Sequence, residues 1–314
     1  MLLIYIEWRR TMRKKWWMWI VLGIIIAVVV SIGIVIAMTK NPKEQKENGN
    51  FKIVTSFYPV YIMTINITQG AQNIEVMNLT QNNVGCLHDY TLAASDMRKV
   101  ENADVFIQNG FGLENFANKI ISTYPNLKIV DSSTNVMGRV EGKEGTNPHI
   151  WTSVENYTKQ VQLITEKLIE YNPENAQVYK QNSETYLKTL NDLKLRYSTE
   201  LHHLNGKKAV ILNEALTYLA KDLQMQTIEI VTNHEESTLS AEIIRNTIEK
   251  MKQENIKIIL VGAEDDLKNA QTLANETGAK IYKLETGLTG TTSKDAYLNS
   301  MIGNLEILKQ IQEF

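Results

Sequence analysis

The segment "AVILNEALTYLA", residues 209–220, combines a strand, a turn and the start of a helix within twelve residues. An apolar run with β-branched side chains ends at Asn213 and Glu214, and an apolar pattern with helical spacing then begins. Asn213 suits a helix N-cap, and Glu214 suits the first turn because the helix dipole favours an acid there. The segment therefore predicts one strand–helix unit of an α/β fold.

The same unit recurs on both sides of this segment. Short apolar runs that are too short for helices alternate with helical patterns along most of the chain. The predicted strands are residues 51–55, 74–77, 105–108 and 128–131 in the first half and 208–212, 227–231, 257–261 and 280–284 in the second. This alternation predicts an α/β fold with two lobes of mostly parallel β-sheet flanked by helices.

A long helical region separates the two lobes. The sequence "NPEN" at residues 172–175 supplies a cap and a proline for the first helical turn, and no further Pro or Gly occurs before Gly206. A helix over residues 172–205 would be a rod of about 45 Å. We therefore expect an N-terminal lobe at 51–171, a connecting helix at 172–205 and a C-terminal lobe at 206–314, with small lobe movements.

The N-terminus differs in kind from the rest. Residues 16–38 contain no charged side chain and would span about 35 Å as a helix, enough for a hydrocarbon core of about 30 Å. Five Arg and Lys residues within 1–15 predict a cytoplasmic basic segment, so that the chain after a polar linker at 39–50 lies outside the cell. An uncleaved transmembrane anchor is the favoured interpretation, and a cleaved signal peptide is the alternative.

Composition limits the function classes. The 314 residues are 43% hydrophobic, which supports one or two domains with real cores, and a single cysteine excludes an intramolecular disulfide. The first 50 residues hold 8 of the 33 Lys and Arg and 3 of the 35 Asp and Glu, which leaves a formal charge of −7 on the remainder. This balance disfavours nucleic acid as a partner and mildly favours a cationic ligand.

Polar residues that follow the predicted strands mark the expected binding site, because ligands of open α/β sheets bind at the carboxyl ends of the strands. These residues are His88, His149, Asn213, Glu214 and Glu285. Two imidazoles with one or two carboxylates suit the coordination of a divalent transition metal. Each residue alone also fits an ordinary loop or capping role. No nucleophile-elbow, phosphate-loop or dinucleotide motif occurs, so we do not expect an enzyme.

Four longer segments carry a family resemblance. They are "GCLHDYTLAASD" (85–96), "ADVFIQNGFGLENF" (103–116), "NPHIWTSVENY" (147–157) and "NPENAQVYKQN" (172–182). In combination and in this order, they resemble the zinc/manganese solute-binding proteins of bacterial ABC transporters. The resemblance runs from about residue 51 to residue 309. It implies two α/β lobes joined by one long helix, with one metal ion held between them.

The resemblance also implies metal ligands, residue by residue. His88 and His149 match the first and second family histidines, and Glu285 falls where the fourth ligand is usually Asp. Asn213 stands at the third ligand position, with Glu214 one residue on, so the third ligand is either of these. A neutral amide is a poor zinc ligand beside imidazole, whereas His₂Glu₂ suits zinc or manganese. Residues 131–147 contain no histidine, unlike the His-rich loop of many zinc-specific members.

The function implied by the resemblance is capture and delivery of an ion. With the anchor predicted from residues 16–38, which departs from the usual lipoprotein of this family, the chain would be a monomer that binds one Zn or Mn ion outside the cell as a transported ligand. It would pass this ion to an ABC transporter permease. The alternative hypothesis is an envelope adhesin or interaction protein with a degenerate metal site, motivated by Asn213 at a ligand position. A third hypothesis is a metal-dependent hydrolase that uses the same His and Glu residues.

Overall fold

The computed structural model describes residues 49–80, 87, 90–136, 140–142, 145–229 and 239–311. Asn50–Phe314 forms one compact unit. The predicted basic segment and membrane anchor lie outside the described residues. Within the described residues, every helix is too short or too polar to cross a membrane.

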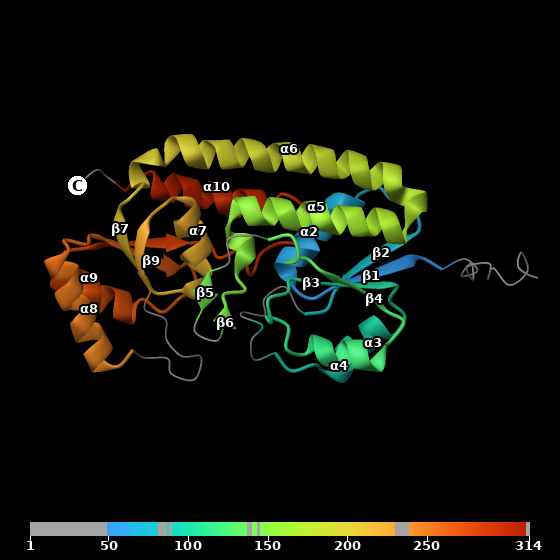
Figure 1. Ribbon diagram of the computed structural model, residues 1–314, viewed down its shortest axis with the longest axis horizontal. Coiled ribbons are helices and arrows are strands. Elements are labelled where there is room, and N and C mark those ends of the chain that lie inside the picture. Colours follow the sequence, from blue (N-terminus) through green and yellow to red (C-terminus); the bar gives the residue numbers. More distant parts are fainter. Residues whose placement is uncertain are drawn as a thin grey trace, which may run out of the picture. The chain divides into compact units, whose positions relative to one another are not determined.

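Two four-stranded parallel sheets form the framework (Figure 1). The first sheet has the order β2-β1-β3-β4 and the second has the order β10-β9-β7-β8. The strands are β1 Phe51–Thr55, β2 Ile74–Asn78, β3 Val105–Gln108, β4 Lys128–Asp131, β7 Lys208–Ile211, β8 Gln226–Glu229, β9 Ile258–Gly262 and β10 Lys280–Leu284. All their neighbouring pairs are parallel, as the strand–helix alternation predicts.

The two sheets share one topology, which the sequence did not reveal as an internal repeat. In each, the first two strands of the half lie side by side, and the third strand pairs with the other edge of the first. The strand order therefore reverses between β1 and β3 in one sheet and between β7 and β9 in the other. Such reversals open a crevice at the carboxyl ends of the strands, which is where ligands bind in this class of fold.

Helices flank both sheets and one long helix joins the halves (Figure 1). The α-helices are α2 Tyr58–Thr68, α3 Ala94–Glu101, α4 Ala117–Thr123, α5 Val154–Tyr171, α6 Ala176–Glu200, α7 Thr217–Asp222, α8 Ala241–Gln253, α9 Lys268–Thr277 and α10 Ala296–Leu308. Helix α6 packs on α5, α2 and α10. Its Asn182 amide donates to the carbonyls of Ile67 and Gln69 in the first half, and its Tyr197 hydroxyl donates to the Met301 carbonyl in the second.

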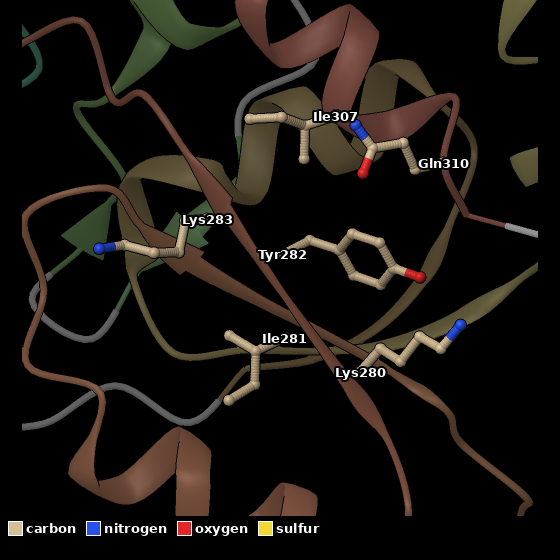
Figure 2. Close-up of a pocket in the computed structure, with 6 residues that line it drawn as sticks. All are labelled: Lys280, Ile281, Tyr282, Lys283, Ile307 and Gln310. Atoms are coloured by element: carbon tan, nitrogen blue, oxygen red, sulfur yellow. The ribbon is translucent and has the colours of Figure 1, made fainter.

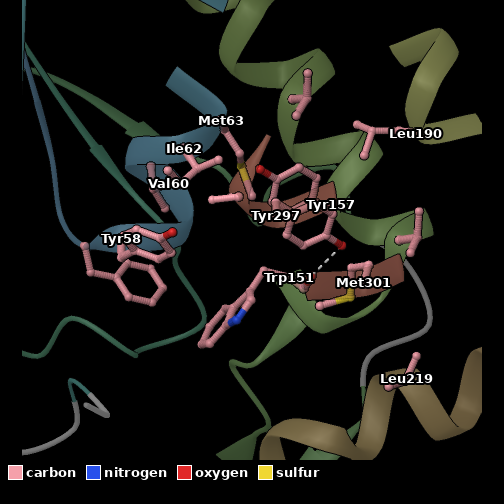
Figure 3. Close-up of a cluster of buried hydrophobic side chains, with 14 of the residues drawn as sticks. Tyr58, Val60, Ile62, Met63, Trp151, Tyr157, Leu190, Leu219, Tyr297 and Met301 are labelled. Carbon is pink, nitrogen blue, oxygen red and sulfur yellow. Dashed lines mark hydrogen bonds between the residues drawn. The ribbon is translucent and has the colours of Figure 1, made fainter. Parts of the chain in front are cut away.

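One large hydrophobic core runs through both halves. It contains Ile53 and Phe106 of the first sheet together with Ile211 and Leu284 of the second. Figure 3 shows its centre, where the stacked rings of α5 and α10 lie between α2 and the Trp151 segment. Because interiors are close-packed, a shared core resists sliding of one half past the other. A smaller second core lies between the second sheet and helices α8 and α9.

The central stack explains how the halves are fastened. Tyr157 of α5 and Tyr297 of α10 stack with ring centroids 3.5 Å apart and planes within 6°. Both rings are buried, and the Tyr297 hydroxyl donates to the Trp151 carbonyl at 3.0 Å. Buried aromatic rings with a satisfied polar tip contribute large apolar area without leaving an unpaired group.

The observed elements differ from the predicted ones mainly at their ends. β1, β3, β4 and β10 have the predicted bounds, whereas β9 is shifted by one residue and β8 spans 226–229, with 230 and 231 outside the described residues. Helix α6 is shorter than the predicted rod because 3₁₀ turns occupy Pro173–Asn175 and His202–Leu204. Asn175 is held there by two hydrogen bonds with Gln72. The two-residue strands β5 Glu141–Gly142 and β6 Gly145–Thr146 were not predicted, because they show no apolar alternation.

Candidate metal centre

His149 lies in a turn that holds it firmly. Its side chain is 5% exposed, and its backbone N–H and its ring Nδ1 both lie 2.9 Å from Oδ1 of Asn147. A 3₁₀ turn, Ile150–Thr152, follows and places the Trp151 ring 5.3 Å from the imidazole, centroid to centroid. The imidazole is therefore fixed at the start of the segment that leads into α5.

The buried carboxylate of Glu114 holds the loop that contacts this turn. Glu114 accepts hydrogen bonds from the Asn109 backbone N–H at 2.7 Å, the Gly110 N–H at 3.1 Å and the Ser56 hydroxyl at 2.8 Å. The Asn109 side chain in turn donates to the Pro148 carbonyl at 2.8 Å, one residue before His149. Burial raises the pKa of Glu114 to about 7, against the lowering effect of its hydrogen bonds. Ser56 and Asn109 follow β1 and β3, so the cluster occupies the strand reversal of the first sheet.

Asn213 occupies the corresponding place after β7. Its Oδ1 accepts from the Ala215 N–H at 3.0 Å, which makes it the N-cap expected from the sequence. Its Nδ2 donates to both carboxylate oxygens of Asp265, at 2.9 and 3.0 Å. A Cβ on Gly262 would lie 2.8 Å from the Asn213 amide nitrogen, so glycine permits this close approach. Both polar atoms of the Asn213 side chain are thus engaged within the second half.

Glu214 brings the second half to His149. Its backbone carbonyl accepts a hydrogen bond of 3.1 Å from Nδ2 of Asn147, the same amide whose oxygen holds His149. Glu214 is partly exposed at the start of a 3₁₀ turn, Glu214–Leu216, that leads into α7. The structure therefore brings His149 and Glu214 to one amide group.

Glu285 approaches from the end of β10. Its backbone N–H donates to Oδ1 of Asn304 at 2.7 Å, and its carbonyl accepts from Nδ2 of the same residue at 2.8 Å. The next carbonyl, of Thr286, accepts from the indole N–H of Trp151 at 2.8 Å. The Glu285 side chain is exposed. Its backbone is therefore tied, through Trp151, to the segment that carries His149.

His88, the remaining predicted ligand, lies outside the described residues. Its neighbour Leu87 is buried in the shared core, and the Leu87 carbonyl accepts from the Tyr90 N–H at 3.1 Å. Within the part of the chain that the structure describes, no three His, Cys, Asp or Glu side chains form a group that could hold a metal ion. The predicted ligand set therefore stays a prediction.

A separate cavity of about 470 Å³ lies beside the edge strand β10 (Figure 2). It is lined by Lys280, Ile281, Tyr282, Lys283, Ile307 and Gln310. Tyr282 is buried, and its hydroxyl has no hydrogen-bond partner among the described residues. Among the predicted ligands that the structure describes, His149, Asn213, Glu214 and Glu285, none lines this cavity.

Comparison with known proteins places this arrangement in a family. The family model described as "Zinc-uptake complex component A periplasmic" matches residues 53–311, which is most of the chain. The chain belongs to this family. The match confirms the resemblance to zinc/manganese solute-binding proteins that the sequence motifs indicate.

Individual members of the family align over long stretches. A high-affinity zinc uptake system protein ZnuA of Bacillus subtilis is 26% identical over 320 residues, covering 95% of this chain and 98% of that protein. A manganese-binding lipoprotein MntA of Halalkalibacterium halodurans is 26% identical over 228 residues, covering 70% of this chain and 75% of the relative. The structure of Zn(II)-bound AdcA from Streptococcus pneumoniae superposes with a TM-score of 0.71 at 26% identity, covering 83% of this chain and 57% of AdcA.

Several residues that organise the centre were missed by sequence reasoning. Asn147 and Trp151 stand in the "NPHIW" motif beside His149, so their proximity along the chain was an available signal. Asp265 and Asn304 lie 52 and 19 residues from the side chains or backbone that they hold. Nothing local marks them, because Asp265 meets Asn213 through the pairing of β7 with β9, and Asn304 meets Glu285 through the packing of α10 on β10.

Proposed function

We propose that the chain is the extracytoplasmic receptor of a divalent-metal ABC uptake system, which binds one Zn or Mn ion between its two halves. The observation that carries the proposal is the contact of His149 and the Glu214 backbone with the single Asn147 amide. This contact brings the segment that carries His149 in one half to the segment that carries Glu214 in the other. Family membership supports the same reading.

The donor set that we propose is His88, His149, Glu214 and Glu285. Two imidazole nitrogens and two carboxylates suit zinc or manganese, and they supply two negative charges for a dication. Asn213 is the less suitable third ligand, since its oxygen caps the turn at Ala215 and its nitrogen donates to Asp265. We assign it to positioning Glu214 rather than to coordination.

The receptor would bind and release its ion without bond chemistry, so we infer that the chain is not an enzyme. A formal charge of −7 after residue 50 favours the approach of a cation. The shared core and helix α6 favour small relative movements of the two halves. A monomer held at the membrane by residues 16–38, with residues 39–50 as a tether, would deliver the ion to an ABC permease.

Equilibrium dialysis of the purified full chain against Zn²⁺ and Mn²⁺ tests the proposal. We expect close to one ion per chain for at least one of the two metals. Anomalous scattering from crystals soaked in each metal would identify the ion and its third ligand. Failure of the wild-type chain to bind either metal at micromolar concentration would rule out the receptor function.

The engagement of Asn213 keeps one alternative open, an envelope adhesin or interaction protein with a degenerate site. On that hypothesis, excess metal would not stabilise the chain, and His88→Ala with His149→Ala would leave its melting temperature in metal unchanged. A receptor should lose its metal-dependent stabilisation in the same double variant, because an ion that binds only the folded state raises stability by mass action.

A further inference from the structure

Asn147 is a fully buried residue whose polar groups all have partners in the structure. Its Oδ1 accepts from the backbone N–H of His149 and lies 2.9 Å from ring Nδ1, and its Nδ2 donates to the Glu214 carbonyl. Its own carbonyl accepts from the Tyr218 hydroxyl at 2.9 Å, and its N–H donates to the Val140 carbonyl at 2.8 Å. A buried amide with this many bonds has little freedom to turn.

The partners also fix which end of the amide faces which half. A backbone N–H can only donate and a backbone carbonyl can only accept, so Oδ1 must face His149 and Nδ2 must face Glu214. The reversed amide would place two donors together at His149 and two acceptors together at Glu214. Because Oδ1 cannot donate, the Nδ1 of His149 must carry the proton. The neutral imidazole then has its lone pair on Nε2.

We propose that Asn147 is a positioning residue that selects the Nε2-coordinating tautomer of His149 and couples it to the Glu214 segment of the other half. This inference rests on the proposed metal-receptor function. A cation bound to Nε2 of His149 withdraws electron density from the ring. It thereby strengthens the hydrogen bond from Nδ1–H to Oδ1 of Asn147. The polarised amide in turn strengthens its donation to the Glu214 carbonyl. Ion capture by one half thereby tightens the contact with the other.

Two substitutions separate the two roles of the amide. Asn147→Asp has almost the same shape, keeps an acceptor for His149 and replaces the donor with an oxygen that faces the Glu214 carbonyl. Asn147→Ala removes both the acceptor for His149 and the donor to the Glu214 carbonyl. Asn182→Asp is the matched control. Asn182 lies on helix α6, and the change removes an amide donor to the carbonyls of Ile67 and Gln69, at the end of α2.

The tautomer is measured directly by ¹⁵N–¹H correlation of the imidazole rings in the metal-free full chain. The chain has five histidines, and His149→Gln assigns the relevant signals. We expect the Nδ1–H tautomer in wild type and in Asn147→Asp, and its loss in Asn147→Ala. An Nε2–H tautomer in wild type would overturn the proposal whether or not the chain binds metal. A correct tautomer in a chain that binds no metal would instead contradict the proposed function.

Metal affinity then tests the coupling between the halves, by competition with a fluorescent chelator for Zn²⁺ and Mn²⁺. Loss of an outer-shell partner typically weakens binding about 10- to 100-fold, so Asn147→Ala should lie in this range. Asn147→Asp should weaken binding by about tenfold although its tautomer is retained, and Asn182→Asp should match wild type. Wild-type affinity in Asn147→Asp would overturn the coupling to Glu214.

Discussion

His149 and Glu285 are both predicted ligands, yet the protein holds them in opposite ways. The imidazole of His149 is buried, and Asn147 fixes its ring and its backbone. Glu285 has a backbone fixed on both sides by Asn304, but its carboxylate is exposed. We infer that the first half supplies a pre-organised donor and the second half supplies donors that adjust. Pre-organisation favours affinity, because less conformational freedom is lost on binding.

Of the variants proposed here, removal of the His149 imidazole should have the largest effect on metal binding. In His149→Ala, the metal-dependent stabilisation should disappear, which amounts to about 2.7 kcal/mol at an ion concentration one hundred times the wild-type Kd. Thermal unfolding with and without metal measures it. His202→Ala, at an exposed position after α6, is the control and should keep the full stabilisation. Undiminished stabilisation in His149→Ala would contradict the proposed site.

The buried Glu114 should make the free energy of unfolding depend on pH. The pKa of Glu114 is raised to about 7 by burial, from an ordinary value of 4.5. The folded state therefore binds this proton more tightly than the unfolded state, and its contribution to stability falls as the pH rises from about 4.5 through about 7. We expect wild type to lose about 2 kcal/mol of this contribution between pH 5 and pH 8.

Glu114→Gln removes the titrating group, so urea unfolding at pH 5 and pH 8 should show a smaller difference than in wild type. Glu170→Gln, at an exposed position on α5, serves as the control and should retain the wild-type dependence. An equal loss of stability with pH in wild type and Glu114→Gln would show that the carboxyl does not titrate as its burial implies.

In the second half, Asn213 is a structural cap and Glu214 is a proposed ligand. Two variants distinguish these roles. Asn213→Ala removes a cap and should lower the free energy of unfolding by about 1 kcal/mol. Glu214→Gln keeps the backbone carbonyl bonded by Asn147 and should instead weaken metal binding by about tenfold, since an amide replaces a carboxylate ligand. Chemical unfolding and chelator competition, applied to both variants, separate the roles. The reverse pattern would make Asn213 the third ligand.

Glu285 should show the smallest effect. Its exposed carboxylate is well screened by solvent, and Glu285→Asp keeps the charge while shortening the reach, so we expect an affinity change of about threefold. Chelator competition at low and high salt checks this, with a larger difference at low salt. A change as large as that of His149→Ala would show that Glu285 is as strictly positioned as the imidazole.

The strand pattern was largely readable from the sequence because it rests on local signals. Apolar runs such as 105–108 and 280–284 have no competing helical period, and their observed bounds match the predicted ones. The cap at Asn213 was predicted for the same reason. The identical topology of the two sheets was not predicted, since strand order depends on pairing between distant segments.

The candidate site was readable only in part. Strand ends marked His149 and Glu214, and the structure brings both to Asn147. The engagement of Asn213 with Asp265 depends on the adjacency of β7 and β9 and on the absence of a side chain at Gly262. Spacing along the sequence does not predict such contacts. Asn213 was therefore predicted as a possible ligand, and its hydrogen bonds to Asp265 were not foreseen.

The position of Trp151 makes its fluorescence a probe of the candidate metal centre. Four of the five tryptophans, Trp8, Trp16, Trp17 and Trp19, precede residue 50, and Trp151 is the fifth. Its indole lies 5.3 Å from the His149 ring and donates to the carbonyl that follows Glu285. Replacing the four N-terminal tryptophans with phenylalanine would leave a chain whose tryptophan emission arises only from Trp151, between the His149 segment and the Glu285 segment. The fold thus contains its own fluorophore for following ion capture without a label.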